Sequence, residues 1–128
     1  MQDKSFLDNL NKLFSKKKFN EVIIKIKENN QFLKNYPDLY NISAVCKILK
    51  SKNTKNDIIS ALQDFENYFL NSKADNKKIE AVCNYIATCV VNSKKFNEIN
   101  TYFKKAKNLY EKCVTDVGYD EKLYIRGA

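Results

Sequence analysis

Residues 79–113 contain two amphipathic segments joined by a short polar turn, and this stretch constrains the fold more than any other. In its first half, apolar residues recur at helical spacing, namely Ile79, Val82, Cys83, Ile86 and Val90. Its second half steps by three and four residues through Phe96, Ile99, Phe103, Ala106, Tyr110 and Cys113. Such spacing places apolar side chains on one face of an α-helix. The turn at residues 92–95 is too short for anything but an antiparallel return, so the stretch predicts a helical hairpin.

The same stepping of apolar residues recurs in the rest of the chain. Four stretches show it, through the apolar residues Phe6, Leu10, Leu13 and Phe14; Phe19, Val22, Ile23 and Ile26; Leu39, Ile42, Cys46 and Leu49; and Ile58, Leu62, Phe65 and Phe69. The tetrapeptide FNEV at 19–22 nearly repeats FNEI at 96–99. We therefore expect helices at about 3–15, 19–34, 37–51, 55–71, 76–93 and 96–114. These helices would form three hairpins, at about 3–34, 37–71 and 76–114.

Local signals support three of the predicted helix starts. Pro37 suits the first position of a helix, where its missing N–H costs nothing. Thr54 has an acid, Asp57, three residues later, which is the pattern of an N-terminal capping box. Asp75 is expected to cap the helix that begins after the longest polar gap of the chain.

The hairpin at 76–114 follows the spacing of a known helical repeat. The positions concerned are Cys83, Ile86, Ala87, Val90, Ile99, Phe103 and Ala106. In this register the hairpin resembles a tetratricopeptide repeat. The resemblance implies an all-α fold of antiparallel hairpins stacked as a short right-handed solenoid. It also implies that Phe103 occupies the packing centre of the third hairpin.

The last residues of the chain resemble the start of the second hairpin. LYIRGA at 123–128 matches LYNISA at 39–44 in its Leu, Tyr and Ala. We therefore expect a fourth hairpin to begin at about 119–128, within a single repeat domain that is a fragment of a longer protein.

In tetratricopeptide proteins, the inner face formed by the first helix of each repeat binds peptides. Carried over by register, the resemblance assigns a peptide groove to Leu7, Asn11, Phe14, Tyr40, Asn41, Ala44, Lys47, Asn84, Thr88, Val91 and Asn92. It implies a protein-interaction or scaffolding module. The implied partner is a protein or peptide, either separate or another domain of the same parent chain. Ala81 and Tyr85 stand where the subfamily that clamps a C-terminal carboxylate has basic residues, so such a clamp is not expected.

Two alternative functions remain open. Similar repeat arrays precede catalytic domains in larger bacterial enzymes such as glycosyl-, sulfo- and methyltransferases, so the chain could be the N-terminal helical region of such an enzyme. A Lys-rich nucleic-acid-binding helical domain is the other alternative, because the formal net charge is +8. Arg126 is the only arginine, and base recognition favours Arg, so a nucleic-acid partner is the less favoured of the two.

The composition argues against catalysis, metal binding and membrane insertion. The chain has no His and only 2 Gly, which removes the His-dependent nucleophile systems and a phosphate-cradling loop. Cys46, Cys83, Cys89 and Cys113 show no C-x-x-C spacing. We expect these thiols to be buried and reduced, with no cofactor, in a cytoplasmic protein that is not an enzyme. No apolar run approaches the roughly 20 residues of a membrane span.

Overall fold

The computed structural model of the chain describes residues 2–117, and this part is all-α. Its α-helices are α1 (Gln2–Ser15), α2 (Phe19–Glu28), α3 (Asp38–Leu49), α4 (Lys55–Asn71), α5 (Asp75–Asn92) and α6 (Phe103–Val117). Two 3-10 segments, η1 (Asn30–Phe32) and η2 (Asn97–Tyr102), precede α3 and α6. The prediction of an all-α fold is therefore confirmed. The expected start of a fourth hairpin at 119–128 lies outside the described residues.

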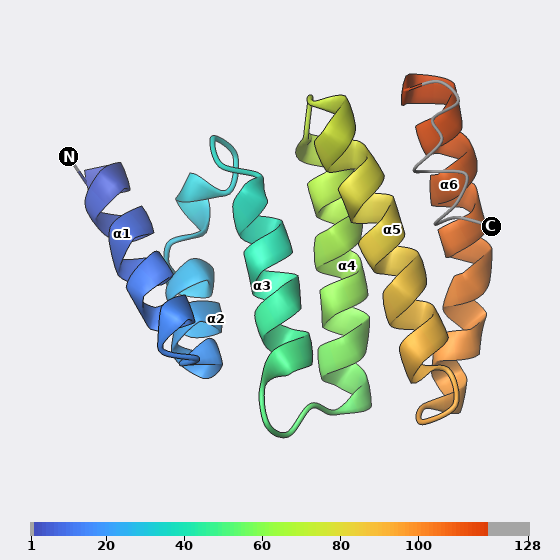
Figure 1. Cartoon of the computed structure of the whole chain (residues 1–128), viewed down its shortest axis with the longest axis horizontal. Coiled ribbons are helices and arrows are strands. Elements are labelled where there is room, and N and C mark those ends of the chain that lie inside the picture. Colours follow the sequence, from blue (N-terminus) through green and yellow to red (C-terminus); the bar gives the residue numbers. More distant parts are fainter. Residues whose placement is uncertain (1, 118–128) are drawn as a thin grey trace.

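The helices stand side by side in the order in which they occur in the sequence (Figure 1). Each helix packs mainly against the helices before and after it in the chain. Because consecutive helices are antiparallel, the connections α1–α2, α3–α4 and α5–α6 lie together at one end of the row, at the bottom of Figure 1. We call this the hairpin-turn end. The α2–α3 and α4–α5 connections lie at the opposite end.

The first turn of α4 confirms the predicted capping box. The Thr54 backbone N–H donates to Oδ2 of Asp57 at 2.7 Å, and the Asp57 backbone N–H donates to Oγ1 of Thr54 at 3.2 Å. The other two predicted starts differ by one residue, because Pro37 and Ala74 occupy the cap positions and the helices begin at Asp38 and Asp75.

The predicted second helices of hairpins one and three are each interrupted by a 3-10 segment. The helix expected at 19–34 ends at Glu28, before η1, and the helix expected at 96–114 begins only at Phe103, after η2. A 3-10 helix has three residues per turn, so the six residues of η2 rotate the chain by about 120° more than an α-helix would. The apolar stripe predicted through η2 is therefore broken.

Phe103 is consequently not the packing centre of the third hairpin, and that prediction is wrong. Its side chain is 36% exposed, whereas Ile99, four residues earlier in η2, is fully buried. On α6 the inward positions belong to Ala106, Leu109 and Cys113. Leu109 was absent from the predicted stripe.

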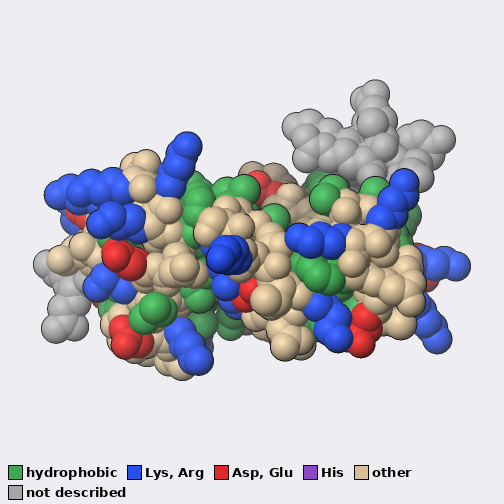
Figure 2. All heavy atoms as spheres, turned by 90° about the horizontal axis from the view of Figure 1, so that it is seen from below, with side chains coloured by type: hydrophobic (Ala, Val, Ile, Leu, Met, Phe, Trp, Pro, Cys, Tyr) green, Lys and Arg blue, Asp and Glu red, His purple; other side chains and the backbone are tan. Residues whose placement is uncertain are grey.

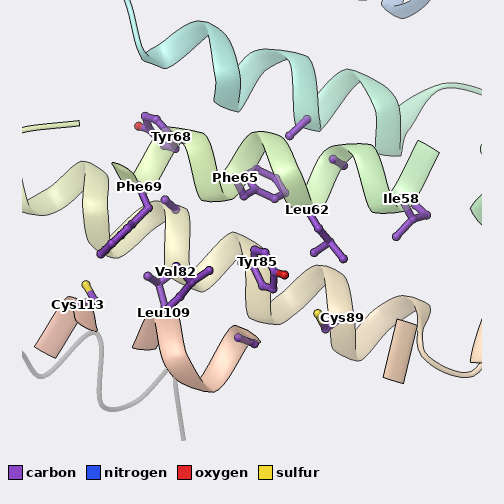
Figure 3. Close-up of a cluster of buried hydrophobic side chains, with 14 of the residues drawn as sticks. Ile58, Leu62, Phe65, Tyr68, Phe69, Val82, Tyr85, Cys89, Leu109 and Cys113 are labelled. Atoms are coloured by element: carbon purple, nitrogen blue, oxygen red, sulfur yellow. The ribbon is translucent and has the colours of Figure 1, made fainter. Parts of the chain in front are cut away.

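Buried side chains form two core clusters that meet at α3. The smaller cluster contains Leu10, Val22, Ile26, Leu39 and Cys46, from α1, α2 and α3. In the larger one, shown in Figure 3, side chains from successive helices meet, among them Leu62 and Phe69 of α4, Val82 and Tyr85 of α5, and Leu109 and Cys113 of α6. Full burial of one large apolar side chain contributes about 1.5–3 kcal/mol, so the larger cluster holds the last four helices together.

Besides Phe103 and Phe14, which is 37% exposed, the residues Val90 and Leu49 were predicted on apolar stripes and are exposed instead. Val90 is 58% exposed because it follows the buried Thr88 by two residues, which places it about 200° around α5 from the packed face. Leu49, the last residue of α3, is 53% exposed. Both residues lie close to the hairpin-turn end.

Candidate interaction surface

Three of the predicted groove residues are enclosed in the protein. Ala44 is fully buried, and Thr88 and Asn92 are also buried. The Thr88 hydroxyl donates to the carbonyl oxygen of Asn84 at 2.7 Å, and Nδ2 of Asn92 donates to the carbonyl oxygen of Thr88 at 2.9 Å. Their side-chain donors are thus satisfied by the turns of α5 before them. The prediction that these three residues line a groove is wrong, because periodicity does not say which face of a helix its neighbours cover.

Two other predicted residues, Asn41 and Asn84, are brought together by the fold. Nδ2 of Asn84 donates to Oδ1 of Asn41 at 3.0 Å, which joins α5 to α3. A turn or two nearer the start of the same helices, Nζ of Lys77 contacts both carboxylate oxygens of Asp38, at 2.5 and 2.6 Å. These side-chain contacts link the first helices of hairpins two and three, which run in the same direction. The asparagine pair therefore serves the stacking of hairpins.

Lys47 and Tyr40 face a different side of α3. Nζ of Lys47 contacts Oδ2 of Asp64 at 2.7 Å and Oγ of Ser60 at 2.8 Å, both on α4. Burial raises the pKa of the Asp64 carboxyl, and the hydrogen bond and charge of Lys47 act against that shift. The pair lines a cavity of about 390 Å³ between α2, α3 and α4, together with Ile23, Ile26, Lys27, Asn30, Leu33, Tyr40, Ser43 and Ser60. Lys47 is thus already neutralised by a neighbour.

The remaining predicted groove residues divide between core and surface. Leu7 is half-buried against the smaller core cluster. Asn11, Phe14 and Val91 are exposed, and Val91, at 75%, is the most exposed large apolar side chain of the described residues. The predicted residues therefore do not form one groove.

Exposed apolar side chains gather instead at the hairpin-turn end. Phe14 lies in the last turn of α1, Leu49 in the last turn of α3, and Val90 and Val91 in the last turn of α5. Figure 2 looks at this end and shows lysines spread over it, with hydrophobic side chains visible between them. Each of the three hairpins thus presents apolar side chains just before its turn.

Lysines follow the apolar residues in every one of these turns. They are Lys16, Lys17 and Lys18 in the first turn, Lys50 and Lys52 in the second, and Lys94 and Lys95 in the third. Lys50 forms an ion pair with Asp57 at 3.0 Å, and Lys95 lies over the ring of Phe96, 5.1 Å from its centroid. Within residues 2–117, the other five form no ion pair.

We define the hairpin-turn surface as Phe14, Lys16, Lys17, Lys18, Leu49, Lys52, Val90, Val91, Lys94 and Lys95. Only Phe14 and Val91 of this set were predicted as binding residues. The sequence did carry a signal for the rest, an apolar residue followed by lysines at each predicted turn. Exposure of those apolar residues was not predictable from periodicity, which treats every apolar residue on a stripe as buried.

The first turn contains an unusual backbone position. Lys17 has φ of 60°, in the left-handed region. Its backbone N–H donates to the carbonyl oxygen of Phe14 at 2.9 Å, and the Lys18 N–H donates to that of Leu13 at 3.0 Å. This pair of bonds is the Schellman motif, which normally places Gly at the left-handed position. The motif fixes the direction in which the three lysines leave α1.

Residues 2–117 contain none of the disulfide, metal-binding or membrane-spanning features considered in the sequence. The four cysteines are buried and carry no disulfide, and burial raises the pKa of Cys46, Cys89 and Cys113 to about 11. Between residues 2 and 117, no cluster of three or more His, Cys, Asp or Glu side chains is placed to hold a metal ion. None of the helices in that range is both long and apolar enough to cross a bilayer.

No protein-family profile matches this sequence, and neither a curated protein nor a solved structure matches it significantly. Function is therefore inferred from the chemistry and geometry of residues 2–117.

Proposed function

We propose that this chain is a non-catalytic protein-interaction or scaffolding module built from tetratricopeptide-like helical hairpins. The observation that carries the proposal is the hairpin-turn surface, where apolar side chains remain exposed in the last turn of the first helix of all three hairpins. Exposed apolar residues that recur in one region typically mark a binding surface. The partner is a protein or peptide, either separate or in another part of the same parent chain.

The packing of the helices supports this role. Successive hairpins are joined by their own core clusters and by the Asn41–Asn84 and Lys77–Asp38 contacts. Such a stack holds its turns in fixed relative positions without help from a ligand. The proposal includes a reducing, cytoplasmic location, because buried cysteines without disulfides are typical of such compartments.

Selection from a peptide library tests the proposed function. Purified chain 1–128 is used to select peptides from a display library of random sequences, and the selected peptides are resynthesised for isothermal titration calorimetry. We expect saturable 1:1 binding with a Kd of about 1–100 µM, the range of a small exposed site. Failure to select any peptide that binds below about 1 mM would contradict the proposal.

A further inference from the structure

The chemistry of the hairpin-turn surface specifies its partner. We propose that this surface binds an acidic segment of a protein chain in which Asp or Glu residues alternate with large apolar residues. This inference rests on the proposed interaction function and adds the place and the chemical class of the partner. It follows from the charge, the spacing and the depth of the exposed groups.

Charge complementarity indicates that the partner is negatively charged. Lys16, Lys17, Lys18, Lys52 and Lys94 form no ion pair with any described residue. Of the acids near these turns, Asp57 and Glu98 are already paired, with Lys50 at 3.0 Å and with Lys55 at 3.4 Å. Glu21, exposed in the first turn of α2, is a single acid beside these lysines and balances only part of their charge. The surface therefore has an uncompensated positive charge, which attracts and orients an acidic partner.

Regular spacing gives the form of the partner. Axes of packed helices are about 8–10 Å apart, so the turns after α1 and α5, four helices apart in the row, are separated by at most about 40 Å. An extended chain of about 12 residues covers that distance. Because every turn offers an apolar site followed by lysines, a segment that alternates apolar and acidic residues matches all three turns.

The apolar side chains lie deeper than the lysines, and this favours a protein segment over a flat anionic surface as the partner. The tips of the turns are polar, namely Lys16–Lys18, Ser51–Asn53 and Ser93–Lys95, while the apolar side chains lie behind them in the last helical turns. A bilayer surface meets the lysines first, and its apolar interior stays away from Leu49 and Val91. A chain segment, by contrast, can place individual side chains between the tips.

Nucleic acid is disfavoured by the same residues. Phosphate contacts need only the lysines and leave the exposed Phe14, Leu49, Val90 and Val91 uncovered. Base stacking relies on flat aromatic platforms, and three of these four side chains are aliphatic. Only a partner with apolar side chains of its own can bury these four exposed side chains.

The test uses chain 1–128 and a pair of fluorescein-labelled synthetic peptides of about 12 residues. One peptide alternates Glu with Leu and Phe, and its counterpart carries Gln at every Glu position. Fluorescence anisotropy is measured at low and physiological salt. We expect the acidic peptide to bind at least about tenfold more tightly than the Gln peptide, and to weaken as salt increases.

Matched variants locate the binding site. Val90→Ser with Val91→Ser removes exposed apolar groups from the surface, and Ile24→Ser with Leu70→Ser removes groups of comparable exposure elsewhere. Lys94→Glu with Lys95→Glu is compared with Lys34→Glu with Lys73→Glu, at the opposite end. We expect roughly a tenfold loss of affinity from the first member of each pair and less than twofold from the second. Circular dichroism melting curves verify that each variant is folded.

The outcomes separate this inference from the proposed function. If library peptides bind but the Glu and Gln peptides bind equally, or the control variants lose as much affinity, the interaction function stands and the inference is overturned. Tighter binding to phosphatidylserine vesicles or to polyuridylate than to the acidic peptide would also overturn it. If neither library nor synthetic peptides bind, the proposed function fails.

Discussion

Asn84 on α5 donates a hydrogen bond through Nδ2 to Oδ1 of Asn41 on α3, across 3.0 Å. An α-helix rises 1.5 Å per residue, so Val91 and Leu49, seven and eight residues later, lie at similar levels about 10–12 Å further along. The asparagine pair therefore sets the register of hairpin two against hairpin three. Through that register it brings their exposed apolar residues to the same end of the row.

Loss of the asparagine pair should loosen the stacking of hairpins. We expect Asn41→Ala to lower the free energy of unfolding by about 1 kcal/mol, because the half-buried amide of Asn84 loses its acceptor. Urea denaturation gives the value, and a double-mutant cycle with Asn84→Ala should show coupling of about 0.5–1.5 kcal/mol. Asn11→Ala, at an exposed position, is the control, with an expected change within about 0.5 kcal/mol. Additive effects of the two pair variants would show that the bond contributes nothing.

Truncations on α6 test the observed orientation of that helix. Leu109→Ala should cost about 2–5 kcal/mol, because Leu109 is only 6% exposed within the larger core cluster. Phe103→Ala should cost about 1 kcal/mol or less, because its ring remains partly in water. Thermal or urea midpoints measured under one set of conditions rank the two. The reverse ranking would restore the arrangement expected from the repeat register.

A glycine at position 17 should stabilise the first hairpin. Lys17 holds a left-handed conformation, which costs a residue with a Cβ roughly 1 kcal/mol more than Gly. Because Gly also has more freedom in the unfolded chain, the net gain expected for Lys17→Gly is about 0.5–1 kcal/mol. Differential scanning calorimetry of the variant should show a higher Tm. A Lys16→Gly variant, next to the left-handed position, should show no gain, and equal effects at 16 and 17 would contradict the turn geometry.

Buried thiols predict a loss of stability at alkaline pH. Burial raises the pKa of Cys46, Cys89 and Cys113 to about 11 in the folded state, whereas an unfolded thiol has a pKa of about 8.5. Between these values the unfolded chain binds fewer protons than the native protein, so the free energy of unfolding falls as pH rises. Their contribution is fully present below about pH 8.5 and is lost progressively toward pH 11.

Urea denaturation in reducing buffer between pH 8 and 10.5 measures that slope. Because ordinary lysine and tyrosine side chains have pKa values of about 10, the informative quantity is the difference between wild type and Cys89→Ala. The variant should be less stable at pH 8 because of the cavity it leaves, and it should lose less stability as pH rises. Parallel pH profiles for the two proteins would show that Cys89 does not hold its proton through folding.

Much of the fold was predictable from the spacing of apolar residues. The bounds of α1, α3, α4 and α5 agree with prediction within two residues, because each carries an uninterrupted stepping of three and four. Thr54 and Asp57 formed the expected capping box because that motif depends only on local sequence. The two 3-10 segments were missed, since residues spaced by three satisfy an α-helix and a 3-10 helix equally.

The candidate surface was harder to predict than the fold. The repeat register assigned Thr88 and Asn92 to a ligand-facing side, yet both side chains donate hydrogen bonds within their own helix and are buried among its neighbours. Val90 carries an apolar side chain, which suggested burial, yet no described helix covers it. Both errors have one cause. Amphipathicity identifies a face, but the packing of α5 between α4 and α6 decides which residues that face includes.

The central claim is that partners bind the hairpin-turn surface, and an NMR titration tests it most directly. Uniformly ¹⁵N-labelled chain is titrated with the acidic peptide, and amide shifts are followed residue by residue. We predict that the largest shifts fall in three separate stretches, 14–18, 49–52 and 90–95, while residue 24 and residues 70–73 stay unchanged. Shifts confined to the opposite end, or to the cavity lined by Lys47 and Asp64, would contradict the account.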